Sequence, residues 1–150
     1  MLFARACAAA DPARALEAAF AGIALPRPDP GGDYRVVSIG KAAVPMAAFL
    51  LGKLAGERVE AIVVTNRENA RPLPGATVHA SGHPVPDDEG ARAADAVEAF
   101  LAPARAGDRV IALISGGGSA LLPAPIAGLT LADKVAVNRL LLATGFEITE

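Results

Sequence analysis

Short apolar runs alternate along the chain with segments whose apolar residues recur at helical spacing. Four runs rich in β-branched and aliphatic residues predict strands, the third weaker than the others: 34–39, 59–64, 76–80 and 110–114. Helical segments begin near Lys41, after the acidic cluster 87–89, and at Thr130, whose spacing to Asp133 is that of a capping box. Continuous apolar strands separated by helices are typical of a mostly parallel sheet with helices on both faces. The pattern predicts a three-layer, doubly wound α/β domain, with the run 110–114 buried on both faces.

Residues 1–33 differ from the rest of the chain. Residues 1–22 carry Ala, Leu and Phe in a helical rhythm, which Asp11-Pro12 interrupts because proline is tolerated only in the first turn of a helix. Either two helices or one kinked helix fits this pattern. Prolines and glycines over 25–32 then exclude regular structure. We expect an amino-terminal helical segment and linker over 1–33, followed by the α/β domain over 34–150.

Composition and charge narrow the classes of partner. The chain has 150 residues, of which 53% are hydrophobic, as expected for one folded domain. A net charge of −2 disfavours nucleic acid as a partner. No apolar run approaches the roughly 18 residues of a spanning helix, and Arg5 interrupts the start of the chain too early for a secretion signal, so we expect no membrane association. Because Cys7 is the only cysteine, no disulfide forms within the chain and a cytoplasmic location fits best.

A glycine-rich loop follows the last predicted strand. Its residues are Ser115, Gly116, Gly117, Gly118 and Ser119. Without Cβ atoms, such a backbone can direct its N–H groups to one point and hold a phosphate, although the same glycines also suit a plain tight turn. The dinucleotide-binding pattern GxGxxG fails because Leu121 stands where the third glycine belongs, and no Gly-Lys-Ser/Thr of a Walker A loop is present. The loop therefore predicts anion binding outside the nicotinamide and P-loop classes.

A second turn, Gly40-Lys41, follows the first predicted strand. A lysine at the start of a helix opposes the helix dipole, and an anionic ligand would compensate for this. A lysine that only extends into water is the alternative. Because parallel sheets bind ligands at the carboxyl ends of their strands, we expect this turn and the glycine loop to converge on one negatively charged group.

The remaining polar candidates carry weaker signals. His79 and His83 lie four residues apart, but with no third histidine and a distant cysteine they favour hydrogen-bonded loop residues, and we expect no metal site. Asp87 is more typical of a helix cap than of a general base. Asn66 lies beyond the second predicted strand, in a polar stretch that we expect to line the same cleft. We expect His83, Asp87 and Asn66 to shape the cleft near the two turns.

Four segments, in one order, resemble the class II glycerate kinases, the ATP-dependent glycerate 2-kinases of the MOFRL group, which are often labelled hydroxypyruvate reductases. The segments are 39–47, 82–87, 113–122 and 128–131. The resemblance extends over residues 34–145. It implies a Rossmann-like domain that phosphorylates D-glycerate to 2-phosphoglycerate with ATP and Mg²⁺, in a cleft shared with a second domain.

The same resemblance implies roles for the two turns. Lys41 would be the catalytic residue that stabilises the transferring phosphate, and Gly40 with the glycine loop would bind phosphate or the substrate carboxylate. Members of the family are much longer than this chain, so we expect a truncated amino-terminal portion with little or no kinase activity alone.

Two other functions stay open. One is NAD(P)H-dependent reduction of hydroxypyruvate, which the absent GxGxxG pattern disfavours. The other is a non-catalytic phosphate-binding domain. Homo-oligomerisation through apolar surface exposed by the truncation is also left open.

Overall fold

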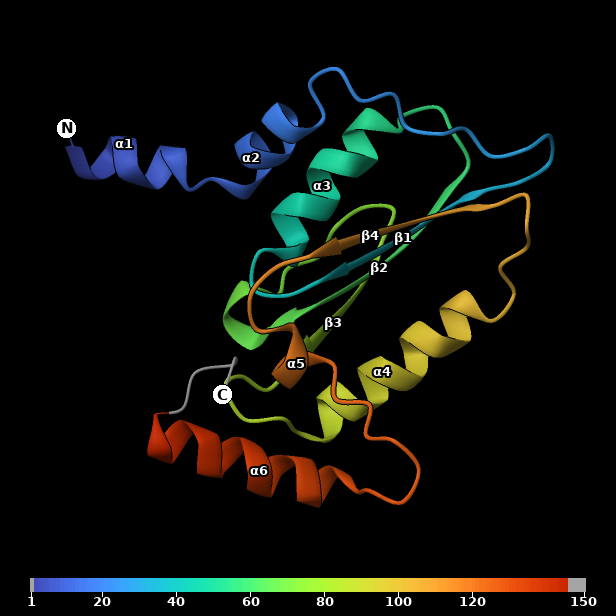
Figure 1. The fold of residues 1–150 in the computed structure, drawn as a ribbon. Helices are drawn as coiled ribbons and strands as arrows, with labels where there is room; N and C mark the ends of the chain where they lie inside the picture. Colours follow the sequence, from blue (N-terminus) through green and yellow to red (C-terminus); the bar gives the residue numbers. More distant parts are fainter. Residues whose placement is uncertain (1, 146–150) are drawn as a thin grey trace.

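The chain folds around a sheet of parallel strands. In the computed structural model, which describes residues 2–145, the strands are β1 (Tyr34–Ile39), β2 (Val59–Asn66), β3 (Thr77–Ser81) and β4 (Arg109–Ile114). They pair in the order β3-β2-β1-β4, and every pairing is parallel (Figure 1). The predicted parallel α/β class is confirmed, and the third strand lies one residue later than expected.

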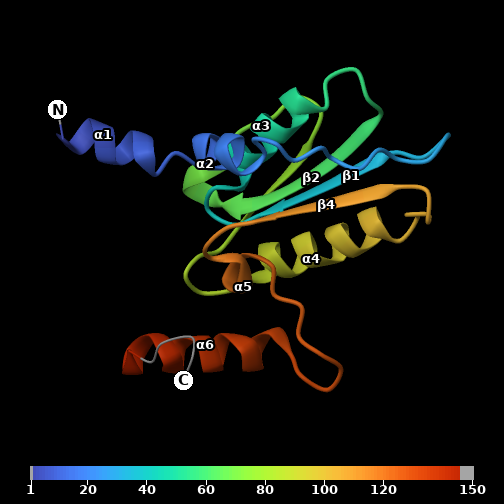
Figure 2. The same ribbon diagram turned by 45° about the horizontal axis from the view of Figure 1, so that its top comes forward.

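Helices cover both faces of this sheet. Their bounds are α1 Leu2–Ala9, α2 Pro12–Ala19, α3 Ala43–Lys53, α4 Asp88–Leu101, α5 Gly118–Leu121 and α6 Leu131–Thr144, and a 3₁₀ turn, η1, spans Arg67–Asn69. α3, with α2 beside it, lies on one face, whereas α4 and α5 lie on the other, with α6 beyond them (Figure 1 and Figure 2). None of the described helices combines the length and the apolar character needed to cross a bilayer.

Each face of the sheet buries its own cluster of apolar side chains. On the α3 face, Val36 of β1 packs in one cluster with Leu50 of α3. On the α4 face, Val37 of β1 shares a cluster with Val97 of α4 and Leu121 of α5. Successive residues of β1 thus enter opposite clusters, because side chains alternate along a strand. This central strand is buried on both sides, as a sheet between two helical layers requires.

Local signals in the sequence set where two of the helices begin. Asp11 caps α2 by accepting hydrogen bonds from N–H groups of the first turn, and Pro12 occupies the first helical position. At α6, Thr130 and Asp133 form the predicted capping box. Of the two arrangements predicted for the amino terminus, the structure has two separate helices.

The prediction for β4 is wrong in one respect. Val110 and Ile114, expected to be buried, are 51% and 67% exposed. Within the described residues β4 is an edge strand that pairs with β1 alone, and α4 packs against β2 and β3 rather than over β4. An apolar run predicts a strand, but the burial of that strand depends on which elements pack beside it, and the run does not encode them.

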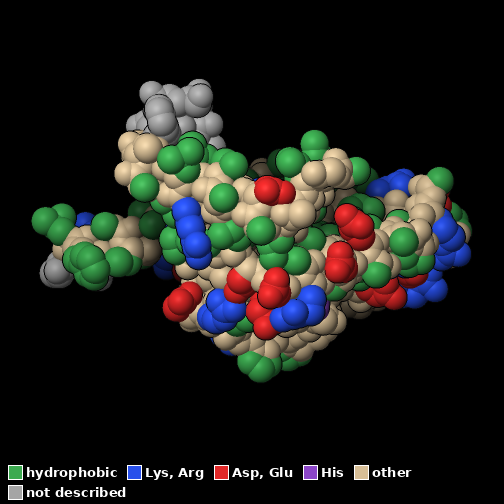
Figure 3. Space-filling view, turned by 90° about the horizontal axis from the view of Figure 1, so that it is seen from below, with side chains coloured by type: hydrophobic (Ala, Val, Ile, Leu, Met, Phe, Trp, Pro, Cys, Tyr) green, Lys and Arg blue, Asp and Glu red, His purple; other side chains and the backbone are tan. Residues whose placement is uncertain are grey.

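α6 lies apart from the rest of the fold. None of its residues is buried, and Val137, Leu140 and Leu142 are each more than half exposed. No hydrogen bond among the described residues joins α6 to the sheet or to another helix. Seen from below in the orientation of Figure 1, hydrophobic side chains are scattered over the surface among the charged ones (Figure 3). The carboxyl-terminal part of the described chain therefore leaves apolar surface open.

Candidate functional site

The two turns singled out by the sequence follow neighbouring strands. Gly40-Lys41 follows β1 and the loop 115–119 follows β4, and β1 pairs with β4 along its whole length. From β1 the chain continues to β2 on one side of β1, whereas β4 lies on the other side. The connections therefore diverge between β1 and β4. Such a switch point, at the carboxyl ends of parallel strands, is where open α/β sheets bind ligands.

Backbone hydrogen bonds hold these two turns together. The Lys41 N–H donates to the Gly116 carbonyl at 3.0 Å, and the Ala42 N–H donates to Ser115 Oγ at 3.1 Å. Gly40 has φ +119°, and a Cβ at this position would lie 2.2 Å from Ser115 Oγ. Glycine is therefore required at position 40 by both backbone conformation and close approach. The two turns are thus in direct contact, and the negatively charged group on which they were expected to converge stays a prediction.

The glycine loop presents N–H groups that have no partner in the described chain. The amides of Gly116, Gly117, Gly118 and Ser119 donate to no acceptor among residues 2–145. Gly117 adopts φ +94°, and the imidazole of His83 lies against it, since a Cβ on Gly117 would be 3.0 Å from His83 Cδ2. Consecutive unpaired N–H groups around a left-handed glycine can contact one anion. The loop is thus chemically suited to a phosphate or carboxylate.

A cavity of about 640 Å³ opens beside this loop. Its lining combines the loop 115–119, His83 and Pro84 with Asn138, Leu141 and Leu142 of α6. Asn138 Oδ1 is buried without a hydrogen-bond partner among the described residues. The volume is in the range of small-molecule sites, and the lining places polar N–H groups next to apolar side chains, as such sites commonly do.

Lys41 lies at the entrance to α3 with its side chain exposed. None of the ion pairs within residues 2–145 includes it. Its backbone contacts the glycine loop, but Lys41 is not among the residues that line the cavity. The Lys41 side chain therefore extends from a turn that contacts the glycine loop. Its ammonium group has no carboxylate partner among the described residues.

Asp87 links the turns that follow β2 and β3. It caps α4 by accepting from the Gly90 N–H at 2.9 Å, accepts from the Gly82 N–H at 3.0 Å, and pairs with Arg67 of η1. Burial raises the pKa of Asp87, but the hydrogen bonds from Gly90, Arg67 and Gly82 outweigh it and hold the pKa below its usual value. The carboxylate is thus committed to structure. Its cleft-shaping role stays a prediction.

The two histidines do not converge. His83 lies against Gly117, whereas His79, on β3, lines a different hollow with Glu60 and Phe100. Among the described residues no three His, Cys, Asp or Glu side chains gather into a group that could hold a metal ion. The structure therefore brings together His83 and the glycine loop but leaves His79 outside the site.

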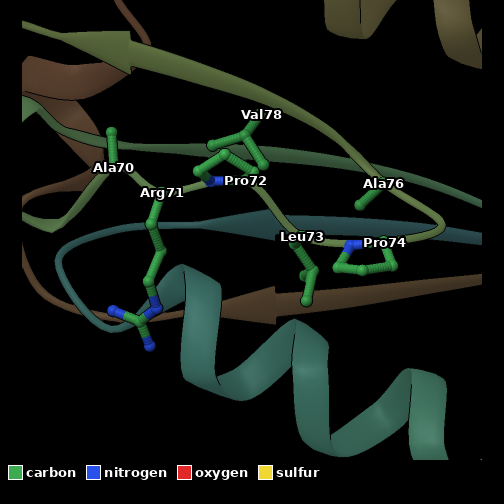
Figure 4. Close-up of a pocket in the computed structure, with 7 residues that line it drawn as sticks. All are labelled: Ala70, Arg71, Pro72, Leu73, Pro74, Ala76 and Val78. Atoms are coloured by element: carbon green, nitrogen blue, oxygen red, sulfur yellow. The ribbon is translucent and has the colours of Figure 1, made fainter.

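A further hollow of about 550 Å³ lies along the segment that precedes β3. Proline and aliphatic side chains line most of it, and Arg71 is the charged residue in its lining (Figure 4). It contains neither of the two turns described above. We assign it no chemistry.

Two asparagines at or near the site make contacts that the sequence does not indicate. Asn69 Nδ2 donates to the Lys41 carbonyl at 2.9 Å, and Asn138 lines the cavity from α6. Asn69 lies 28 residues from Lys41, and Asn138 shares only the cavity with the glycine loop. Asn66, by contrast, was predicted beside the cleft, and it is buried next to Asn69, accepting from Asn69 Nδ2 at 2.8 Å.

Known proteins with similar sequences carry related names. The family described as "Domain of unknown function (DUF4147)" matches residues 1–150. A "Putative hydroxypyruvate reductase" from Agrobacterium vitis is 44% identical over 119 residues, which cover 79% of this chain and 31% of that protein. A "Glycerate 2-kinase" from Pyrococcus horikoshii is 37% identical over 119 residues, which cover 79% of this chain and 27% of that protein.

A solved structure has a similar fold. The crystal structure of glycerate kinase from Thermotoga maritima matches with a TM-score of 0.77 and 28% identity, over 92% of this chain and 32% of that one. The chain thus spans about a third of the length of the relatives it matches. The resemblance to glycerate kinases indicated by the four sequence segments is confirmed, and by its match over all 150 residues the chain belongs to the DUF4147 family.

Proposed function

We propose that this chain is the amino-terminal portion of a two-domain glycerate 2-kinase of the MOFRL group. The reaction transfers the γ-phosphoryl group of ATP to a hydroxyl of D-glycerate, giving 2-phosphoglycerate. The observation that carries the proposal is the meeting of the Lys41 turn with the unpaired N–H groups of the glycine loop at the switch point of the sheet. Relatives named glycerate 2-kinase and glycerate kinase support it.

The chemistry requires positioning and charge stabilisation more than covalent catalysis. The bond from the γ-phosphorus to its bridging oxygen breaks and ADP leaves with that oxygen. A bond from the γ-phosphorus to the glycerate oxygen forms, and the proton of the hydroxyl is released as H⁺. N–H groups of Gly116, Gly117, Gly118 and Ser119 would hold a phosphate or the glycerate carboxylate. The ammonium of Lys41 would follow the negative charge on the transferring phosphoryl oxygens, as fixed cations do in phosphoryl transfer.

The described residues include groups suited to ATP, but none that we assign to Mg²⁺. The unpaired N–H groups and the exposed Lys41 suit the phosphates of ATP. Mg²⁺, when bound with ATP, would supply positive charge that offsets the negative charge of those phosphates. Because no group of metal-binding side chains gathers among the described residues, we assign none of them as a ligand of the metal.

The kinase proposal includes a second domain. The chain spans about a third of its matched relatives, β4 is an edge strand within the described residues, and α6 has no buried residue. One wall of a cleft positions only some of the reacting groups, and misplaced groups lose most of the advantage of proximity. We therefore expect little or no kinase turnover from the 150-residue chain alone. A cytoplasmic location, consistent with the lone Cys7, belongs to the same proposal.

The reductase name of the Agrobacterium relatives leads to a second candidate, reduction of hydroxypyruvate by NAD(P)H. The position where the dinucleotide pattern needs its third glycine is Leu121, which is fully buried in the core on the α4 face. The third glycine of that pattern lets the helix pack closely against the strand, and a leucine at this position does not. A non-catalytic phosphate-binding domain is the third candidate.

One set of assays on the longer parent protein separates these candidates. We expect ATP-dependent phosphorylation of D-glycerate that Lys41→Ala nearly abolishes, and no change in NADH fluorescence on mixing. NADH binding with hydroxypyruvate turnover and no phosphorylation would establish the reductase instead. Unchanged activity in Lys41→Ala would remove the catalytic role of this turn. Phosphorylation of glycerate by the 150-residue chain at the rate of the parent would contradict the need for a second domain.

A further inference from the structure

Asn69, the last residue of η1, contacts the turn that carries Lys41. Its Nδ2 donates to the Lys41 carbonyl at 2.9 Å and to Asn66 Oδ1 at 2.8 Å. The Lys41 N–H, in turn, donates to the Gly116 carbonyl at 3.0 Å. The backbone of Lys41 is therefore held between the loops that follow β2 and β4, while its side chain is exposed.

The Lys41 carbonyl needs a donor from outside its own helix. If α3 began one residue earlier, this carbonyl would accept from the N–H four residues further on, but that residue is Pro45, which has no N–H. The helix instead starts with the bond from the Met46 N–H to the Ala42 carbonyl at 3.1 Å. Asn69 thus donates the hydrogen bond that the Lys41 carbonyl cannot receive from α3.

A chain of contacts fixes which way the Asn69 amide points. Asn66 Nδ2 donates to Glu68 Oε2 at 2.5 Å. Hydrogen bonds from its own backbone N–H and from Asn66 lower the pKa of Glu68, so this side chain is an acceptor at neutral pH. With its nitrogen turned to Glu68, Asn66 presents Oδ1 to Asn69. Only the amide nitrogen of Asn69 can donate to both Asn66 Oδ1 and the Lys41 carbonyl.

We propose that Asn69 is a positioning residue for Lys41, holding the main chain of the turn so that the ammonium group reaches the transferring phosphoryl group. This inference rests on the proposed kinase function. Asn69 is not among the residues that line the cavity, so its effect is transmitted through Lys41. A group that fixes the geometry of a catalytic cation, and touches no substrate, affects kcat rather than KM.

The test compares Asn69→Asp with wild type in the parent kinase. Aspartate has the same shape but replaces the donor to the Lys41 carbonyl with an acceptor. We expect kcat to fall about ten- to hundredfold while KM for ATP and for glycerate stays within about twofold. Asp95→Asn is the matched control: it also exchanges a carboxylate and an amide, but at an exposed position of α4 that forms no ion pair in the described chain, and it should retain wild-type kcat. If Asn69→Asp fails to fold, Asn69→Ala replaces it, because alanine removes the donor without adding charge.

A double variant separates this inference from the proposed function. In the Lys41→Ala background, Asn69→Asp should cause no further loss, because a residue that acts through an ammonium group has nothing to position once that group is gone. Equal losses in both backgrounds, a raised KM with unchanged kcat, or wild-type kcat for Asn69→Asp in a kinase that depends on Lys41 would each overturn the positioning role. Absence of Lys41-dependent phosphorylation in the wild-type parent would overturn the proposed function instead.

Discussion

The two ends of the sheet use their polar groups in opposite ways. At the amino ends of the strands, the guanidinium of Arg35 is buried and contacts the carboxylates of Asp108 and Glu60. Asp108 also accepts from the N–H groups of Asp33 and Arg105 at 3.0 and 2.9 Å. At the carboxyl ends, Lys41 and the N–H groups of the glycine loop have no such partners in the described chain.

The difference separates two tasks along the same strands. Buried charges that pair within the chain fix how the strands and their connections fit together, and removing one partner leaves the other charge buried alone. Donors without a partner contribute nothing of this kind, but they remain free to contact an anion. The amino ends of the strands therefore serve stability, and the carboxyl ends serve the proposed ligand site.

Removing the free cation should have the largest effect, and on activity alone. Lys41→Ala in the parent protein is expected to lower kcat by about 10²–10³-fold, because a fixed charge that stabilises the transition state is lost. The melting temperature should stay unchanged, since the side chain is exposed and unpaired in the described chain. Lys53→Ala, at the other end of α3, is the matched control and should leave kcat at the wild-type value. A lower melting temperature for Lys41→Ala would contradict the assignment of the carboxyl ends of the strands to the ligand site alone.

Breaking the charge cluster at the amino ends should give the largest loss of stability. Arg35→Met keeps most of the side-chain volume but leaves the Asp108 carboxylate buried without its cation, so the free energy of unfolding should fall by about 3 kcal/mol. Arg92→Met removes the exposed pair with Glu89 and should change it by less than about 0.5 kcal/mol. Urea denaturation of the 150-residue chain measures both. Equal effects of the two substitutions would show that the buried cluster contributes no more than a surface pair.

A single methyl group added at Gly40 should break the contact between the two turns. Gly40→Ala forces a left-handed backbone on alanine and places its Cβ 2.5 Å from the Ser115 carbonyl oxygen, so unfolding should be easier by about 2 kcal/mol or more. Gly116→Ala is the control, since a Cβ there meets nothing within 4 Å. Denaturant midpoints of the two variants should therefore differ clearly. Similar midpoints would mean that the close approach of the turns is not required.

Acid should act on the amino ends of the strands. Hydrogen bonds from the Arg105 and Asp33 N–H groups, and then from Arg35, lower the pKa of Asp108 from 3.8 to about 2. The folded state therefore holds this carboxylate ionised where the unfolded chain would protonate it. The resulting stability is fully present above about pH 4 and is lost as the pH falls through about 2. Asp108→Asn should flatten the decline of unfolding free energy between pH 5 and 2. An unchanged decline would assign acid sensitivity to other carboxylates.

The smallest effects are expected at the caps of α4 and α6. Asp87→Ala removes the acceptor for the Gly90 and Gly82 N–H groups and should lower the free energy of unfolding by about 1 kcal/mol. Thr130→Ala, which removes the capping box of the detached α6, should lower it less, because α6 has no buried residue. Thermal unfolding followed by circular dichroism gives both values. A larger effect at Thr130 would show that α6 contributes to the cooperative fold.

Much of the fold follows from local pattern, and the failures follow from contacts that are distant in sequence. The β1 run 34–39 predicted its strand because apolar β-branched residues at both faces suit a central parallel strand. The two turns could be placed at one site because the carboxyl ends of parallel neighbours lie together. The exposure of Ile114 was missed because the apolar run is the same for an edge strand and a central one. The hydrogen bond from Asn69 to the Lys41 carbonyl was not predicted because the two residues lie 28 positions apart in the sequence.

α6 forms one wall of the cavity. It is connected to the rest of the fold by residues 123–130, which form neither helix nor strand. Tilting this wall breaks no strand pairing and, within the described residues, no hydrogen bond to the body of the protein. The width of the cavity therefore depends on what holds α6 in place. Whatever packs against the open apolar side of α6 also determines how large a molecule fits beside the glycine loop.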